Sequence, residues 1–167
     1  DEDLSRGLGD VYKRQEYSQT HGYTPGIVTG KPLELGGSEG REAATGRGTA
    51  LITREAAEKW NIDLKGSKVV VQGFGNVGSY AAKFLNEYGC KIIGVSDISG
   101  GLYEPGGFDV DELFDYNYKK RTIDGYQQGK KISNEELLAL ECDFLIPAAL
   151  GSAINKQNVD SLNCKII

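Results

Sequence analysis

Apolar and polar positions along this chain follow two different periods. Short runs rich in β-branched residues predict strands buried on both faces: "KVVVQG" at 68–73, "KIIGVSD" at 91–97 and "CDFLIP" at 142–147. A fourth run, "CKII" at 164–167, predicts the start of another strand. Between the first two strands, residues 76–89 place apolar side chains on one helical face, and Gly89 provides the stop signal.

Helical spacing of apolar residues recurs before and after these strands. The other predicted helices cover roughly 45–60, 110–120, 133–140 (where Ser133 and Glu136 have the spacing of a capping box) and a short stretch at 154–162. The glycine- and proline-rich residues after Asp97 predict a loop. Alternating strands and helices predict an α/β fold of the Rossmann type, doubly wound, with a mostly parallel sheet and flanking helices. We expect the fold to be truncated at both ends.

The N-terminal third has a different character. Residues 1–15 are polar and aperiodic, and residues 16–31 carry turn formers that predict extended or looped chain. Residues 31–48, "KPLELGGSEGREAATGRG", contain five glycines among eighteen residues together with several charges. Such a composition is typical of neither a linker nor a strand, so it calls for a functional reason.

Composition excludes several classes of protein. A length of 167 residues suits one domain, and a net charge of −5 argues against a nucleic-acid partner. The longest apolar stretch is too short for a membrane span, and no signal peptide is evident. Three cysteines without C-x-x-C spacing argue against a disulfide framework and a zinc site, and the single histidine, His21, builds no metal site or triad. We therefore expect no metal, and a cytoplasmic location.

One motif carries chemistry. Gly73-x-Gly75-x-x-Gly78 follows a predicted strand and opens a predicted helix. The first glycine permits a tight turn, the second lets the backbone approach a pyrophosphate, and the third lets helix and strand pack closely. The helix N-terminus adds free N–H groups and a partial positive charge for phosphates. The alternative is a turn without a ligand.

Asp97 ends the next predicted strand, nineteen residues after Gly78. A carboxylate there can accept hydrogen bonds from the ribose of an adenosine and would repel a 2′-phosphate. NAD is therefore favoured over NADP, although Ser96 and Ser99 weaken that preference. The alternative for Asp97 is a solvated carboxylate at a strand end.

A resemblance to a known family extends this interpretation. "HGYTPGIVTGKPLELGGSEGREAATGRG", "VVVQGFGNVG" and "CDFLIPAALGSAIN" together resemble the cofactor-binding portion of the glutamate dehydrogenases, within the wider glutamate/leucine/phenylalanine/valine dehydrogenase superfamily. The resemblance covers about 16–167. It implies that the glycine-rich segment lies at the cleft between a substrate domain and the cofactor domain, which would explain its composition.

The resemblance also implies roles for particular residues. Thr45 would bind the nicotinamide carboxamide, with a helix cap as its alternative, and Arg41 would lie near the substrate carboxylate, with a surface salt bridge as its alternative. Asn76 would lie near the ribose and pyrophosphate, a role compatible with a helix N-cap. Ala148 and Ala149 would line the adenosine and ribose, or form an ordinary strand exit. The complete expected cofactor set is Thr45, Gly73, Phe74, Gly75, Asn76, Val77, Gly78, Asp97, Ala148 and Ala149.

Parts of the family pattern are missing from this chain. The substrate domain, with the lysine and aspartate that handle proton transfer, is absent, so no residue here is expected to be catalytic and the chain alone is expected to be inactive. The predicted division is an unmatched leader over 1–15, for which a non-native origin is one interpretation, a cleft segment over 16–48 and an incomplete NAD(P)-binding domain over 49–167.

The resemblance implies an enzyme that oxidatively deaminates L-glutamate to 2-oxoglutarate and ammonia, reversibly, as a homohexamer acting on small molecules. Two alternatives stay open. One is a leucine, valine or phenylalanine dehydrogenase, because the residues that read the substrate side chain lie mostly outside this chain. The other is a non-catalytic dinucleotide-sensing module, for which the segment with Arg41 and Thr45 would have no purpose.

Overall fold

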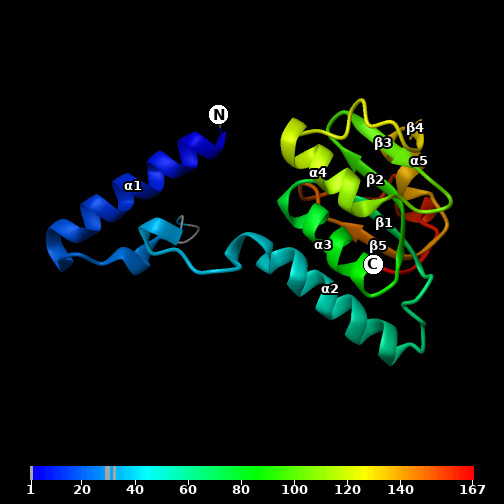
Figure 1. Ribbon diagram of the computed structural model, residues 1–167, viewed down its shortest axis with the longest axis horizontal. Coiled ribbons are helices and arrows are strands. Elements are labelled where there is room, and N and C mark those ends of the chain that lie inside the picture. Colours follow the sequence, from blue (N-terminus) through cyan, green and yellow to red (C-terminus); the bar gives the residue numbers. More distant parts are fainter. Residues whose placement is uncertain (1, 29–30, 32) are drawn as a thin grey trace. The chain divides into compact units, whose positions relative to one another are not determined.

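The computed structural model describes the whole chain except residues 1, 29–30 and 32 (Figure 1). The chain divides into two compact units, Asp1–Glu42 and Ala43–Ile167. The helices of the described part include none with the length and apolar character needed to cross a membrane.

The N-terminal unit is built on a helix. It contains the α-helix α1 (Glu2–His21) and two 3-10 turns, η1 (Pro25–Ile27) and η2 (Leu33–Leu35). The extended or looped structure predicted from residue 16 onward is wrong as far as His21, because local contacts favour the helix. The Tyr17 and His21 rings stack with centroids 4.0 Å apart. Gly22 follows the helix with a φ of +74°, a left-handed conformation suited to glycine.

A six-stranded mixed sheet forms the centre of the second unit, with the order β4-β3-β2-β1-β5-β6. Its strands are β1 (Lys68–Gln72), β2 (Lys91–Asp97), β3 (Gly100–Tyr103), β4 (Lys130–Ile132), β5 (Cys142–Pro147) and β6 (Cys164–Ile166). β1 runs parallel to β2 and β5, and β6 runs parallel to β5, whereas β3 and β4 are antiparallel additions beyond β2. The four strands predicted from apolar runs are confirmed.

The loop predicted after Asp97 is partly wrong, because it contains β3, and β4 was not predicted at all. Neither strand has a run of apolar residues: β3 is "GGLY" and β4 is "KKI". A Cβ at Gly101 would lie 3.0 Å from the side chain of Ile132, so glycine is what lets these two strands approach.

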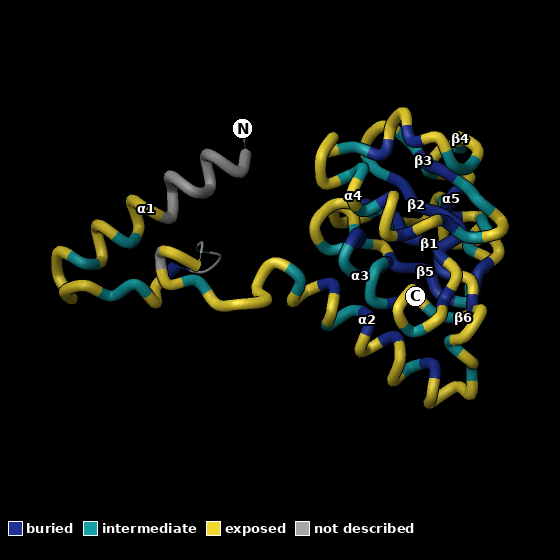
Figure 2. Tube along the Cα trace, viewed as in Figure 1, coloured by how far each residue is buried: buried dark blue, intermediate teal, exposed yellow. Residues whose placement is uncertain are grey.

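Helices cover both faces of the sheet, as a doubly wound fold requires. The α-helices are α2 (Arg41–Lys59), α3 (Asn76–Glu87), α4 (Val110–Lys120) and α5 (Asn134–Leu138), and η3 (Val159–Ser161) is a 3-10 turn. Val69 and Val71 of β1 belong to the core shared with α2, α3 and α4, whereas Val70 belongs to the core shared with α5. Figure 2 shows these strands dark blue, enclosed by more exposed segments.

Element boundaries differ from the predictions in three places. α2 begins at Arg41, inside the glycine-rich segment and before the predicted residue 45. α5 is shorter than predicted, although its capping box is confirmed: Ser133 Oγ accepts a hydrogen bond from the backbone N–H of Glu136, and Glu136 Oε2 accepts one from that of Ser133. The predicted helix at 154–162 is only the turn η3.

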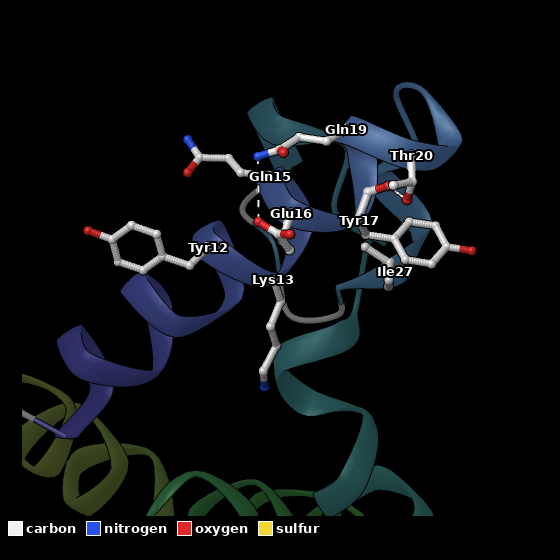
Figure 3. A pocket seen from close by; sticks show the side chains of 8 residues that line it. All are labelled: Tyr12, Lys13, Gln15, Glu16, Tyr17, Gln19, Thr20 and Ile27. Atoms are coloured by element: carbon white, nitrogen blue, oxygen red, sulfur yellow. Dashed lines mark hydrogen bonds between the residues drawn. The ribbon is translucent and has the colours of Figure 1, made fainter.

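A hollow in the N-terminal unit lies along α1 and is shown in Figure 3. Its lining residues are Tyr12, Lys13, Gln15, Glu16, Tyr17, Gln19, Thr20 and Ile27. The rings of Tyr12 and Tyr17 point away from each other, and Gln19 donates a hydrogen bond of 3.5 Å to Glu16. The sequence predicts no chemistry for these residues, and we assign no site to them.

Candidate dinucleotide site

The turn after β1 depends on a glycine. Gly73 has a φ of +88°, in the left-handed region, and a Cβ atom there would lie 2.7 Å from the carbonyl oxygen of Ala148. Both the conformation and the space therefore exclude a side chain. The turn leads directly from the central strand of the sheet to the start of α3.

The next two glycines have different surroundings. A Cβ at Gly78 would lie 1.9 Å from the carbonyl oxygen of Gly73, so α3 packs directly onto the turn that precedes it. A Cβ at Gly75, in contrast, would have no heavy atom within 4 Å. Gly75 therefore presents bare backbone on an open side of the loop, where a ligand could approach.

α3 begins at this loop. Its N-cap is Gly75 rather than Asn76, which corrects the alternative that Asn76 is the N-cap; Asn76 is the first helical residue and is exposed. The first N–H groups of a helix lack partners within the helix and carry a partial positive charge. This end of α3, with Gly75 and Asn76 exposed, is therefore suited to a pyrophosphate.

Phe74 and Val77 support the loop from inside. Phe74 is 1% exposed, and its backbone N–H donates a 2.6 Å hydrogen bond to the carbonyl oxygen of Ser96. Val77 is half-buried on the first turn of α3. These residues fix the loop to the end of β2 and contribute apolar contacts rather than polar ligands.

Asp97 lies beside the loop, at the carboxyl end of β2. One carboxylate oxygen, Oδ1, accepts hydrogen bonds from Ser99, and the other, Oδ2, accepts them from Thr122 and Ile123. Burial alone would raise the pKa of the Asp97 carboxyl, but these hydrogen bonds outweigh it and lower the pKa below its usual value. Asp97 is therefore an ionised acceptor at the position predicted for a ribose contact.

The exit of β5 completes the edge. The backbone N–H of Ala148 donates a 2.8 Å hydrogen bond to the carbonyl oxygen of Gln72, so the chain leaving β5 lies against the turn that leaves β1. Ala148 is half-buried and Ala149 is exposed. Their small side chains leave room beside the glycine loop, and the three parallel strands β1, β2 and β5 thus bring together residues far apart in sequence.

Two buried polar atoms lie directly beneath this edge. Gln72 and Ser96 are paired across β1 and β2, and their side-chain oxygens, Oε1 and Oγ, are buried and have no hydrogen-bond partner within the described part of the chain. Polar atoms of this kind usually mark a functional place or an ordered water. Together with the open Gly75, the α3 N-terminus and Asp97, they make this edge fit a dinucleotide.

The turn of α2 that carries Thr45 packs against the start of α3. The neighbouring Gly46 is buried, and a Cβ there would lie 2.8 Å from the carbonyl oxygen of Val77, so this turn of α2 packs on the first turn of α3. Thr45 is exposed and its carbonyl oxygen accepts a hydrogen bond from Thr49. An open cavity adjoins this place, lined by α2 residues together with Val77, Pro147 and Ala148 among others.

Arg41 belongs to the N-terminal unit, where it is exposed at the first residue of α2. Its substrate-proximal role stays a prediction. Thr122 and Ile123 were not predicted; they follow α4 and bind Asp97 from 25 and 26 residues away. No motif marks them, because a hydroxyl and a backbone N–H can donate at any position.

Comparisons with known proteins agree with this geometry. The family model for glutamate/leucine/phenylalanine/valine dehydrogenase matches residues 36–167. The chain is 48% identical over 158 residues to the cryptic catabolic NAD-specific glutamate dehydrogenase GudB of Bacillus subtilis, covering 94% of this chain and 37% of that protein. It is 51% identical over 141 residues to the NADP-specific glutamate dehydrogenase of Saccharolobus shibatae, covering 84% and 33%.

A solved structure shows the same arrangement. The hetero-hexameric glutamate dehydrogenase of Thermus thermophilus, in its Leu-bound form, superposes with a TM-score of 0.81 at 34% identity, covering 92% of this chain and 36% of that one. The chain thus spans about a third of the length of the relatives it matches. With the family match over 132 residues, from 36 to 167, the chain belongs to the glutamate/leucine/phenylalanine/valine dehydrogenase family.

Proposed function

We propose that this chain supplies the dinucleotide-binding part of an NAD(P)-dependent glutamate dehydrogenase, which oxidatively deaminates L-glutamate to 2-oxoglutarate and ammonia in a reversible reaction. The observation that carries the proposal is the edge formed by the glycine loop, Asp97 and Ala148, in a chain about half identical to NAD- and NADP-specific glutamate dehydrogenases.

The residues divide the work by their chemistry. Backbone N–H groups from Gly75 to Gly78 bind the pyrophosphate at the α3 N-terminus. Asp97 accepts hydrogen bonds from the adenosine ribose, and the small side chains of Ala148 and Ala149 leave room for that ribose. When bound, the nicotinamide ring supplies hydride-transfer chemistry.

Two further residues orient the reacting end. Thr45 positions the nicotinamide carboxamide through its hydroxyl, and Arg41 lies near the substrate carboxylate, a guanidinium–carboxylate pair with defined geometry. No residue of this chain is assigned to proton transfer; that chemistry belongs to the substrate domain.

The ionised Asp97 supports NAD as the preferred dinucleotide, because a 2′-phosphate beside a carboxylate is repelled. The relatives include both an NAD-specific and an NADP-specific enzyme, so specificity within the family varies. NADP is therefore the alternative cofactor for this chain.

The proposal includes the organisation of the whole enzyme. Residues 49–167 are assigned to the NAD(P)-binding domain and residues 16–48 to the segment next to the substrate domain. The likeness to a hetero-hexameric enzyme supports a hexamer; that its subunits are identical is part of the proposal. All three cysteines, Cys90, Cys142 and Cys164, are free thiols, which supports a cytoplasmic location.

The proposal is tested by assaying the enzyme that contains this chain in its full reading frame. NAD and NADP reduction is followed with glutamate, leucine, valine and phenylalanine in parallel, and the 167-residue chain serves as a control expected to show no turnover. Turnover confined to glutamate supports the proposal. Preference for a branched or aromatic amino acid overturns the substrate, and dinucleotide binding without any turnover favours the sensing-module alternative.

A further inference from the structure

The Asp97 carboxylate joins three parts of the chain. Oδ1 accepts hydrogen bonds of 2.7 and 2.5 Å from the backbone N–H and the hydroxyl of Ser99, in the turn between β2 and β3. Oδ2 accepts hydrogen bonds of 2.8 Å each from the hydroxyl of Thr122 and the backbone N–H of Ile123, in the loop after α4. Two ionised oxygens offer about four acceptor positions in all, so this carboxylate is fully engaged.

The two oxygens differ in their surroundings. Ser99, which binds Oδ1, is exposed, and its hydroxyl rotates freely once released. Ile123, which binds Oδ2, is 1% exposed and packs in the core with α3 and α4, so its N–H cannot move away without disturbing that core. Oδ1 is therefore the oxygen that a ribose hydroxyl can reach more easily, by replacing the hydroxyl of the exposed Ser99.

The hydroxyl of Thr122 has a fixed direction. Its oxygen accepts a 3.1 Å hydrogen bond from the backbone N–H of Asp124, and its single proton is donated to Asp97 Oδ2. The preceding Arg121 ends α4 in a left-handed conformation with a φ of 60°, and its N–H bonds to the carbonyl oxygen of Asn117. The loop is thus anchored on both sides of Thr122, which makes it a rigid support for the carboxylate.

We propose that Thr122 is a positioning residue of the dinucleotide site: its hydroxyl holds Oδ2 of Asp97 so that Oδ1 faces the adenosine ribose. Until the dinucleotide binds, the hydroxyl of Ser99 occupies the place of the ribose 2′-hydroxyl at Oδ1. This inference rests on the proposed dinucleotide binding. It adds a residue from the α4–β4 loop to a site otherwise built from the ends of β1, β2 and β5.

The test measures binding by calorimetry on the full 167-residue chain, with NAD and with its analogue that lacks the adenosine 2′-hydroxyl. Thr122→Val removes the hydroxyl at nearly constant shape, and Thr122→Ser keeps it. We expect Thr122→Val to weaken NAD binding roughly five- to ten-fold, which is part of the worth of one hydrogen bond to a charged group, while changing affinity for the deoxy analogue less than about two-fold. Thr122→Ser is expected to bind both ligands as the parent chain does.

The Ser99→Ala variant gives an independent readout, because its exposed position leaves folding intact. Removing the competing hydroxyl is expected to raise the affinity for NAD about two-fold or more and to leave the affinity for the deoxy analogue unchanged. The inference is overturned if Thr122→Val weakens the binding of both ligands equally or changes neither affinity. It is also overturned if Ser99→Ala leaves the affinity for NAD unchanged or lowers it. Failure of the parent chain to bind NAD would instead overturn the proposed function.

Discussion

Gly78 lies so close to Gly73 that a Cβ on the first would sit 1.9 Å from the carbonyl oxygen of the second. The contact joins the first turn of α3 to the end of β1 across the loop that would bind a pyrophosphate. Gly75, between them, has open space where its side chain would be. One glycine of the motif is therefore required for packing and another for access, and substitutions can separate these roles.

Gly78→Ala should destabilise the protein, because the methyl group forces α3 away from β1. We expect a loss of about 3 kcal/mol or more in the free energy of unfolding, at the upper end of the cost of overpacking. Urea denaturation followed by circular dichroism measures it.

Gly75→Ala is the matched control for access. Its φ of −81° suits alanine and its methyl group meets no protein atom, so stability should stay within about 0.5 kcal/mol of the parent. NAD affinity should fall by at least about ten-fold, because the methyl group stands where the pyrophosphate approaches. Unchanged affinity in Gly75→Ala would contradict the placement of the dinucleotide.

Gly46 and Gly48 form a second matched pair, both on α2. A Cβ at Gly46 would lie 2.5 Å from Tyr80 Cβ and 2.7 Å from the backbone nitrogen of Ala81, whereas at Gly48 it would meet nothing within 4 Å. Gly46→Ala should cost roughly 1–3 kcal/mol of stability, and Gly48→Ala should stabilise by up to about 1 kcal/mol through helix propensity. Thermal unfolding of both variants measures these differences in stability. Equal melting temperatures would rule out the close contact between α2 and α3.

Asp97→Asn should make stability depend differently on pH. The pKa of Asp97 is lowered in the folded protein, so its ionised form contributes stability above the unfolded pKa of about 4, and that contribution is lost as the pH falls through the lower folded value. The variant should be less stable than the parent at pH 7, and the gap should close toward strongly acidic pH. Urea midpoints across that range test it; a gap that stays constant would show that ionisation of Asp97 does not matter.

Asp143 of β5 should contribute more to stability than Lys165, its ion-pair partner, because its carboxylate joins β5 to both β1 and β6. Its carboxylate lies 2.7 Å from Lys165 Nζ of β6, and it accepts a hydrogen bond of 2.8 Å from the backbone N–H of Lys68 in β1. Lys165→Met should cost at most about 1 kcal/mol, because the lysine end of the pair is exposed to water, whereas Asp143→Asn should cost about 1–3 kcal/mol. Urea denaturation of the two variants compares the two losses in the free energy of unfolding; equal losses would contradict this ranking.

Local patterns predicted the parallel part of the fold. β1, β2 and β5 are apolar because both faces of the sheet are covered, and a run such as "VVV" at 69–71 is typical of a strand in that setting. The antiparallel strands β3 and β4 have no such signal, since "GGLY" and "KKI" become strands only by pairing with β2 and with each other. The helix α1 (Glu2–His21) was missed because residues 1–15 show no apolar period and the turn-forming residues that follow the helix were given too much weight.

The sequence by itself determined the βαβ order, the glycine loop and the carboxylate that ends β2, because each depends on neighbours within a few residues. Only the tertiary structure decided which atoms meet: that Ala148 lies on the turn at Gly73, that Gly46 packs on α3, and that Thr122 binds Asp97. Such contacts join residues far apart in the chain, and they depend on strand register and helix packing. No local periodicity encodes them, because a hydroxyl or a glycine acquires its role from the partner that the fold brings to it.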